Sequence, residues 1–403
     1  MRKIIALISI TILLFACGRK NTPGKNEVIF EGRFIHSRAH VIYFDIIHVD
    51  HTEKWDSVVL NANGMFYLKK KIQEPYFLKV YLNESSFFTI VAKPGDHLYL
   101  SGSIPDFKNA YNVSGSPESE LIHQYLTHTK QQYAKLDSIA IFWENHKYDL
   151  RKMRIRDSLD SISKIIYSSQ EKYTADLVRK NMQNLGTLFI VYQYFGPYPV
   201  LDTKTYLPLL DSLAKTLLSL YPTNEHVHHL LMKIKKAKLA EEEQQQLAKR
   251  LSPGNPAPLF SLPDKNDSLI SLDKFKGRYV LLHFWATWSP TSSKELRILK
   301  MYHATYAQRG VVFISIAFDY DKNMWEKVIN SEKLNWIQLC DFKYIDSPIA
   351  KLYGIKKIPQ YFLIDPQGII VSKSNKLDEI GPELYKIFFK YMKPSTLGDS
   401  IHL

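Results

Sequence analysis

The sequence has few cysteines, no long apolar run and no large block of one charge. Cys17 and Cys340 are the two cysteines among 403 residues, so a framework of several disulfides is excluded. The apolar run at residues 4–16 is shorter than the ~20 residues that a membrane-spanning helix needs. The formal net charge of +13 is spread evenly and forms only short basic clusters, which are typical of a solvated surface.

Residues 1–16 have the pattern of a secretory signal peptide, with two basic residues before the apolar run. Residues 14–17, Leu-Phe-Ala-Cys, resemble a bacterial lipobox, which implies cleavage before Cys17 and acylation of that cysteine. Residues 17–27 would then be a lipidated tether. The alternatives are an ordinary signal peptide and an uncleaved anchor. The predicted location is the bacterial cell envelope, as a membrane-anchored lipoprotein facing the periplasm.

Lipidation of Cys17 would leave Cys340 as a lone thiol and exclude a structural disulfide within the chain. The predicted partner is then a bacterial membrane, reached through the lipid and through anionic head groups. A nucleic-acid partner is not expected for an exported protein.

The segment at residues 279–293, YVLLHFWATWSPTSS, predicts a buried strand that runs through a short turn into a helix. Ser289 is suited to the N-cap position, and Pro290 to the first helical position. Such a turn directs free N–H groups and a helix dipole at one point. An α/β domain commonly carries its chemistry there.

Residues 284–296, FWATWSPTSSKEL, resemble the active-site segment of thioredoxin-like proteins of the TlpA/ResA type, whose pattern is F-W-A-x-W-C-x-x-C-x-x-E. Ser289 and Ser292 stand at the two cysteine positions. The chemistry that the resemblance implies needs a thiolate and a second, resolving thiol. Because a hydroxyl forms no disulfide, no catalytic residue is expected at this site.

The resemblance continues over about the last 140 residues and implies a thioredoxin fold in the order βαβαββα. Ile358-Pro359 matches the cis-proline position of that family, where the proline leaves a backbone edge open for an extended substrate. Glu295 matches a further position of the family pattern. We expect its carboxylate to stabilise the first turn of the helix, where a negative charge is favourable.

The remaining chain predicts two further domains. Residues 28–116 contain short β-branched and aromatic runs between turn signals, which predict an antiparallel sandwich or barrel. This part resembles a β-rich domain of unknown function that precedes thioredoxin-like domains in envelope lipoproteins. Residues 117–252 predict a connector of four to six helices. The fold class is therefore multidomain, with an all-β sandwich or barrel, a helical region and a C-terminal α/β thioredoxin fold at residues 253–394, followed by a tail at 395–403.

Histidines do not predict a metal site. His48 and His51 are expected on one strand, facing opposite sides. His226 and His229 share a helix face, with His228 beside them, and we expect all three to be exposed to solvent. No metal and no cofactor are predicted.

The predicted function is a redox-inactive binding or scaffold protein that uses a groove formed by Trp285, Trp288 and Pro359. Its predicted partner is an extended peptide or an envelope protein.

The alternative is a TlpA/ResA-type thiol-disulfide oxidoreductase in envelope redox homeostasis, acting through Cys340 with a partner. The apolar setting of Cys340 and the adjacent acid argue against the alternative, because both raise a thiol pKa.

Overall fold

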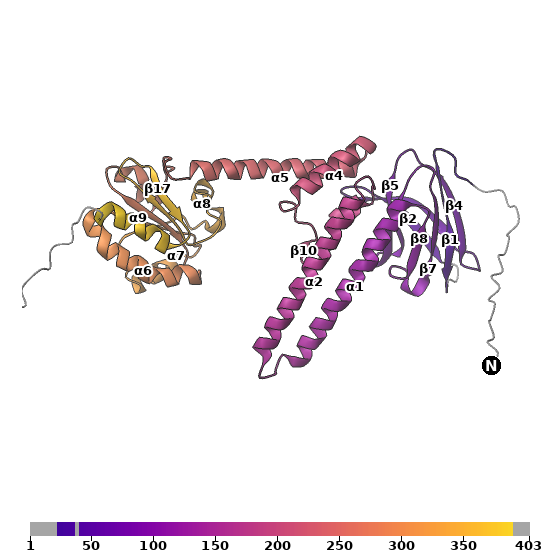
Figure 1. Ribbon diagram of the computed structural model, residues 1–403, viewed down its shortest axis with the longest axis horizontal. Coiled ribbons are helices and arrows are strands. Elements are labelled where there is room, and N and C mark those ends of the chain that lie inside the picture. The colour runs from indigo at the N-terminus through magenta and orange to yellow at the C-terminus, as the bar shows by residue number, and fades with distance from the viewer. Residues whose placement is uncertain (1–21, 37–39, 390–403) are drawn as a thin grey trace, which may run out of the picture. The chain divides into compact units, whose positions relative to one another are not determined.

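The computed structural model describes residues 22–36 and 40–389, which divide into two compact units with the boundary between Lys238 and Leu239 (Figure 1). The predicted signal peptide, the acylation site Cys17 and the tail at residues 395–403 lie outside the described residues. Within them, none of the helices is long and apolar enough to cross a membrane. The predicted multidomain architecture is confirmed, with β-sheets first, helices next and an α/β domain last.

The first unit begins with two four-stranded sheets, whose strand orders are β4-β1-β7-β8 and β3-β2-β5-β6. Apolar side chains from both sheets, such as Phe30, Phe44 and Leu98, share one buried core, so the domain is a sandwich. Its strands are β1 (Glu27–Ile35), β2 (Val41–Ile47), β3 (Thr52–Val59), β4 (Met65–Lys71), β5 (Tyr76–Asn83), β6 (Ser86–Ala92), β7 (His97–Ser103) and β8 (Tyr111–Ser114).

Two features of the sandwich differ from the sequence prediction. The strands β1 and β7 run parallel, so an entirely antiparallel arrangement is wrong for this pair. The four residues of β8 form too short an alternation for the sequence pattern to predict a strand at residues 111–114. It is stabilised as a strand by antiparallel pairing with β7.

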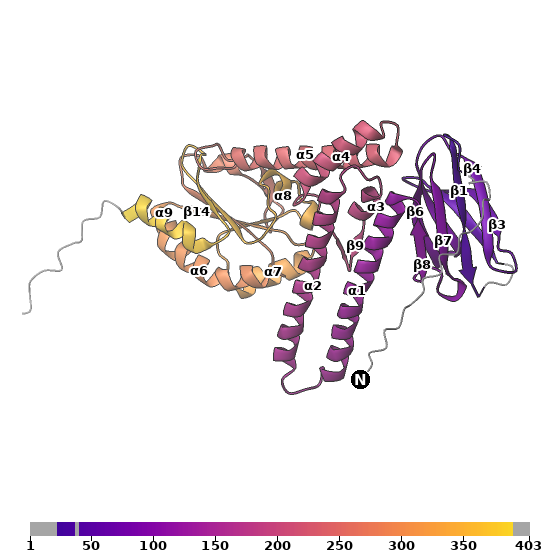
Figure 2. The ribbon, with the colours of Figure 1, turned by 45° about the vertical axis from the view of Figure 1, so that its right-hand side comes forward.

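The helical part that follows contains α1 (Pro117–His146), α2 (Lys152–Lys180), α3 (Thr187–Val191), α4 (Leu207–Leu220) and α5 (Glu225–Arg250), with a short ribbon of β9 (Tyr194–Phe195) and β10 (Tyr198–Pro199). The long helices α1 and α2 run side by side as a hairpin, which Figures 1 and 2 show from two directions. The core of this part includes residues of α1 to α5 and reaches β6 through Val91.

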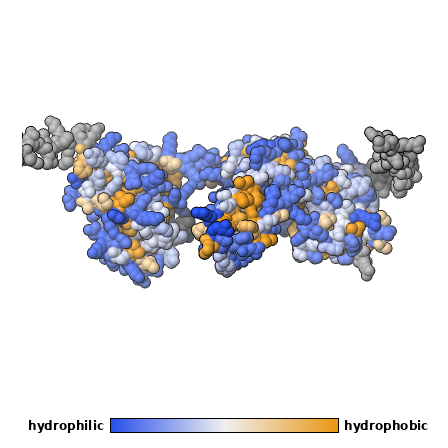
Figure 3. All heavy atoms as spheres, turned by 60° about the horizontal axis from the view of Figure 1, so that its bottom comes forward, coloured by the Kyte–Doolittle hydropathy of each residue, from blue (hydrophilic) through white to orange (hydrophobic). Residues whose placement is uncertain are grey.

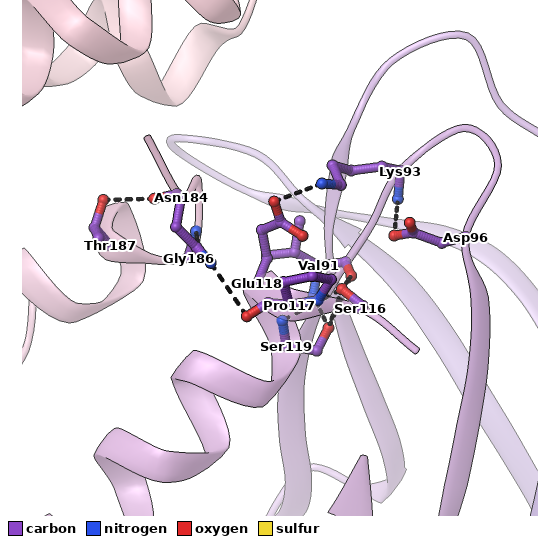
Figure 4. Close-up of polar contacts among 10 residues, drawn as sticks. All are labelled: Val91, Lys93, Asp96, Ser116, Pro117, Glu118, Ser119, Asn184, Gly186 and Thr187. Carbon is purple, nitrogen blue, oxygen red and sulfur yellow. Dashed lines mark hydrogen bonds and ion pairs between the residues drawn. The ribbon is translucent and has the colours of Figure 1, made fainter. Parts of the chain in front are cut away.

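The start of α1 is fixed to the sandwich by a buried polar cluster (Figure 4). The hydroxyls of Ser116 and Ser119 both lie 2.8 Å from the carbonyl oxygen of Val91, and the Val91 N–H donates to Ser119 Oγ at 2.9 Å. Lys93 Nζ lies 2.6 Å from the buried carboxylate of Glu118. These bonds satisfy polar groups that burial would otherwise leave without partners, so the hairpin is anchored at its open end.

The predicted placement of the histidines is wrong in two places. His48 and His51 lie in the turn between β2 and β3, where their rings stack with centroids 4.5 Å apart. His226 is largely buried, and its Nε2 lies 2.9 Å from the Ile47 carbonyl oxygen, whereas His228 and His229 are exposed. Within the described residues, no group of three or more ligand-type side chains could hold a metal ion.

The second unit contains a five-stranded sheet of order β15-β14-β13-β16-β17. The helices α6, α7 and α9 pack on one face, while α8 and the end of α5 pack on the other. The elements are β13 (Val280–Trp285), α6 (Pro290–Tyr306), β14 (Val312–Ala317), α7 (Lys322–Ser331), β15 (Ile337–Cys340), α8 (Pro348–Leu352), β16 (Gln360–Ile364), β17 (Ile370–Ser374) and α9 (Leu377–Phe389), preceded by a hairpin of β11 (Ser261–Pro263) and β12 (Leu269–Ser271).

This order contains one more strand than the predicted βαβαββα pattern. The additional strand, β15, carries Cys340 and pairs in parallel with β14. Its segment is apolar but only four residues long, so the sequence pattern did not separate it from a loop.

Candidate functional site

The site is a turn between the buried strand β13 and the helix α6. All six residues of β13 are buried, as predicted. Ser289 has the extended backbone of an N-cap residue, with φ −89° and ψ 111°, and its Oγ accepts a hydrogen bond from the Ser292 N–H at 3.2 Å. Pro290 occupies the first helical turn. The predicted cap is therefore confirmed, and the turn is held in the conformation that exposes a helix N-terminus.

The two serines have no arrangement for nucleophilic catalysis. Ser289 Oγ accepts from backbone, and Ser292 is fully buried, with an Oγ that has no hydrogen-bond partner among the described residues. A serine nucleophile needs an adjacent base to take its proton. Neither hydroxyl is bonded to a histidine, lysine or carboxylate in the part of the chain that the structure describes.

A small pocket of about 110 Å³ lies beside the turn. Trp288 forms one wall, with half of its surface exposed, and its Nε1–H donates to the Phe318 carbonyl oxygen at 3.0 Å. The Tyr344 ring packs against it at 5.5 Å. The other lining residues are Ala350, Ile355, Lys356, Lys357 and Ile358. The pocket is therefore apolar inside, with two exposed lysines among its lining residues.

The predicted groove residues are placed at different depths. The Ile358–Pro359 bond is cis, as expected, but Pro359 is buried. Trp285 is also fully buried, because it is the last residue of β13 and packs with Leu296 and Trp325 beneath the helices. Of the three, only Trp288 offers an exposed surface, so the groove walls assigned to Trp285 and Pro359 are wrong.

Asp319 is a residue of the site that the sequence reading did not identify. It is buried at the end of β14, and it accepts bonds from the Thr287 hydroxyl at 2.7 Å and from the Thr287 N–H at 3.2 Å. Burial raises the pKa of Asp319, which the bonds from Thr287 partly oppose. The sequence could have indicated Asp319, because it comes just after a buried parallel strand. The carboxyl ends of neighbouring parallel strands lie at the same edge of a sheet, so residues there come close together. Asp319 thus fixes the turn that carries Trp288.

Comparison with known proteins places this domain in a family. The AhpC/TSA family matches residues 253–373. The thiol-disulfide oxidoreductase ResA of Bacillus subtilis (strain 168) is 29% identical over 121 residues, which cover 30% of this chain and 66% of that protein. ResA of Bacillus thuringiensis subsp. konkukian (strain 97-27) is 32% identical over 125 residues, covering 30% and 68%. The chain belongs, through its C-terminal domain, to the ResA-type thiol-disulfide oxidoreductase family.

The relatives are matched only in part, because the chain spans about two thirds of the length of these ResA proteins. A solved thiol-disulfide oxidoreductase from Bacteroides fragilis NCTC 9343 is 31% identical, with a TM-score of 0.32, and covers 33% of this chain and 99% of that chain. The first 250 residues lie outside the matched family region.

In this ResA-type domain, Glu295 has a different role from the predicted one. It lies in the second turn of α6, and its Oε2 accepts a hydrogen bond from the Tyr361 hydroxyl of β16 at 2.6 Å. Burial, together with this bond, raises the pKa of Tyr361 far above its ordinary value. Glu295 therefore connects the site helix to the central sheet, so its assignment to the first helical turn is wrong.

His283 lies in the middle of β13, on the face of the sheet that α6, α7 and α9 cover. Its Nδ1 is 3.0 Å from Ser315 Oγ, and its ring stacks on Tyr361 at 5.0 Å. Burial lowers the pKa of His283 to about 3, so the ring is neutral at physiological pH. Its Nε2 has no partner among the described residues.

Cys340 is not brought to the turn. It ends β15 and pairs in register with Ala317 of β14, which in turn pairs with Trp285 of β13. Two strand spacings, about 10 Å, therefore separate Cys340 from the end of β13. Burial raises the pKa of the Cys340 thiol to about 11. A thiol that is buried and protonated is a poor nucleophile.

Proposed function

We propose that the chain is a redox-inactive binding protein of the bacterial envelope, which binds an extended peptide at the pocket beside Trp288. The observation that carries this proposal is the pair Ser289 and Ser292 at the two cysteine positions of a ResA-type domain. Disulfide exchange proceeds through a mixed disulfide between two sulfur atoms, which a hydroxyl cannot form. The fold of the site, its cap and the cis bond before Pro359 are all retained.

The pocket defines the chemistry of the peptide. Its volume of about 110 Å³ and its walls of Trp288, Phe318 and Ile358 suit one apolar side chain. Lys356 and Lys357 are exposed among the lining residues, and they favour a carboxylate next to that side chain. The proposed ligand is therefore an extended segment with an apolar residue beside Asp or Glu.

Trp288→Ala tests this proposal. With synthetic peptides of the sequence class above, we expect the variant to bind about 30-fold more weakly, because a half-exposed tryptophan that forms a pocket wall has the character of a binding hot spot. Titration calorimetry on the full chain measures the affinity. Met301→Ala removes an exposed apolar side chain from α6, outside the pocket, and should bind as the parent does. Equal affinity of Trp288→Ala and the parent would show that the peptide does not bind at this pocket.

The alternative function, disulfide exchange through Cys340 and a partner, predicts a reactive thiol. We expect the opposite, because a rise of the pKa from 9.0 to about 11 alone lowers the thiolate fraction about 100-fold at neutral pH, and burial slows access further. Alkylation of Cys340, followed by peptide mass mapping, should be slow in the native chain and fast in denaturant. Rapid native labelling below neutral pH would support the alternative.

We further propose that a lipid on Cys17 holds the chain at the membrane. Cys17→Ala should leave the chain soluble or with its signal uncleaved, since each buried CH₂ of an acyl chain contributes roughly 0.8 kcal/mol to membrane binding. Fractionation of cells and the mass of the N-terminal peptide measure both outcomes. If the variant is cleaved and still sediments with membranes as the parent does, the lipid is not the anchor.

A further inference from the structure

The closed end of the α1–α2 hairpin exposes an unusual number of apolar side chains. Leu150, in the loop between the helices, is fully exposed, and Tyr148 is 88% exposed. Ile141, Phe142 and Met153 are further exposed apolar residues close to the loop, and Ile162 and Ile165 follow farther along α2. Figure 3 looks toward this end and shows an apolar area with strongly hydrophilic groups beside it. A soluble surface rarely gathers so many large apolar side chains unless it meets another surface.

The same end is basic. Residues 141–156 contain Lys147, Arg151, Lys152, Arg154 and Arg156 against two carboxylates, a net charge of +3 with histidine neutral. Both carboxylates are already paired, Glu144 with Lys147 and Asp149 with Arg151. Lys152 and Arg154 have no carboxylate within 4 Å among the described residues, so their charge is available to an external anion.

A cleft of about 800 Å³ continues the apolar surface between the two helices. Ile139, Ile155 and Leu159 line its interior, while Arg151 and Arg154 are among the basic residues that line it. Apolar walls beside guanidinium groups match the combination of an acyl chain and an anionic head group.

We propose that this hairpin end, residues 141–156, inserts into the surface of an anionic lipid bilayer. Trp143 and Tyr148 are residue types that favour the boundary between head groups and acyl chains, and long basic side chains reach from there to phosphate. The exposed apolar residues lie in the loop and on both helices, whereas a single partner helix would cover only one side. A second copy would place like basic charges against each other.

This proposal does not depend on the peptide pocket or on a lipid at Cys17. The hairpin end belongs to the first unit, and the pocket belongs to the second. The surface would act as a second, independent contact with the membrane, and the experiment separates the two.

The test places one fluorescent probe on the full chain in vesicles of phosphatidylcholine with roughly one third phosphatidylglycerol. Leu150→Cys carries the probe at the hairpin end, and Met232→Cys carries it at an equally apolar, exposed position on α5. The parent chain, labelled in the same way, gives the background from its own cysteines. Because both labelled chains have the same N-terminal segment, any contact of that segment with the vesicle is the same in both, and the comparison does not depend on lipidation.

We expect nitroxide-labelled lipids to quench the probe at position 150 and aqueous iodide to quench the probe at position 232. Arg154→Gln should lower the ratio of inserted to free hairpin about fivefold, which is the ~1 kcal/mol of one basic side chain near an anionic surface. Lys172→Gln, an exposed position farther along α2, should leave that ratio unchanged.

Two results would overturn the proposal. One is equal access of iodide to both positions in anionic vesicles. The other is protection of position 150 from iodide without quenching by nitroxide lipids, which would show that protein, either a second copy or another part of this chain, covers the hairpin end.

Discussion

Replacing Ser289 and Ser292 together by cysteine is expected to create an intramolecular disulfide and measurable disulfide-reductase activity, where the parent shows none. Position 289 caps α6 and already accepts a hydrogen bond from the backbone N–H of residue 292 at 3.2 Å. A thiolate placed there receives the same bond and the helix dipole, and both lower its pKa. Position 292 is one helical turn away, where a second thiol can resolve a mixed disulfide.

The burial of Ser292 indicates that the fold accepts a cysteine at position 292. Its hydroxyl is fully buried without a partner among the described residues, which costs on the order of 1 kcal/mol. A thiol is a weaker hydrogen-bonding group and loses less at such a position. Ser292→Cys alone should therefore raise the free energy of unfolding, by about 1 kcal/mol at most.

The measurement is reduction of a disulfide substrate by the full chain, together with thiol counting after mild oxidation. The double variant should reduce the substrate at least about tenfold faster than the parent and either single variant, because one thiol alone cannot complete the cycle. Glu295 and Tyr361 are unchanged in all four proteins, so differences come from the thiols. Two cysteines that stay reduced under oxidising conditions would show that the turn lacks the geometry of a disulfide site.

Acid should destabilise the C-terminal domain through His283. Burial lowers the pKa of this group from 6.5 to about 3, so the unfolded chain takes up a proton below about pH 6.5 while the folded domain does not. Proton uptake by the unfolded state alone favours unfolding. The contribution of His283 to stability is therefore fully present above about pH 6.5 and is lost as the pH falls toward 3, at up to about 1.4 kcal/mol per pH unit.

Urea unfolding of the full chain between pH 4 and pH 7, followed by tryptophan fluorescence, measures this dependence. His283→Phe should flatten it, since the ring that resists protonation is gone, although loss of the bond to Ser315 lowers stability at neutral pH. A slope that is unchanged in His283→Phe would assign the acid sensitivity to other groups.

Local sequence determined much of the site. A run of buried apolar residues predicted β13, and Ser289 followed by Pro290 predicted the cap and start of α6. These features depend on neighbours within a few residues, where backbone sterics and capping bonds decide the structure. The serines at both family cysteine positions were also evident in the sequence, and they are the basis of the proposed loss of disulfide exchange, because a hydroxyl forms no mixed disulfide.

Tertiary structure alone decided which of those residues face the solvent. Trp285 and Trp288 are three apart in one motif, yet one is buried under α7 and the other lines the pocket, because β13 ends between them. Asp319 joins Thr287, and Glu295 joins Tyr361, through contacts that link positions 32 and 66 apart in the chain. Strand pairing also decided where β8 and β15 form. Both are too short to be predicted from their own residues, and each is a strand because a neighbouring strand supplies its hydrogen bonds.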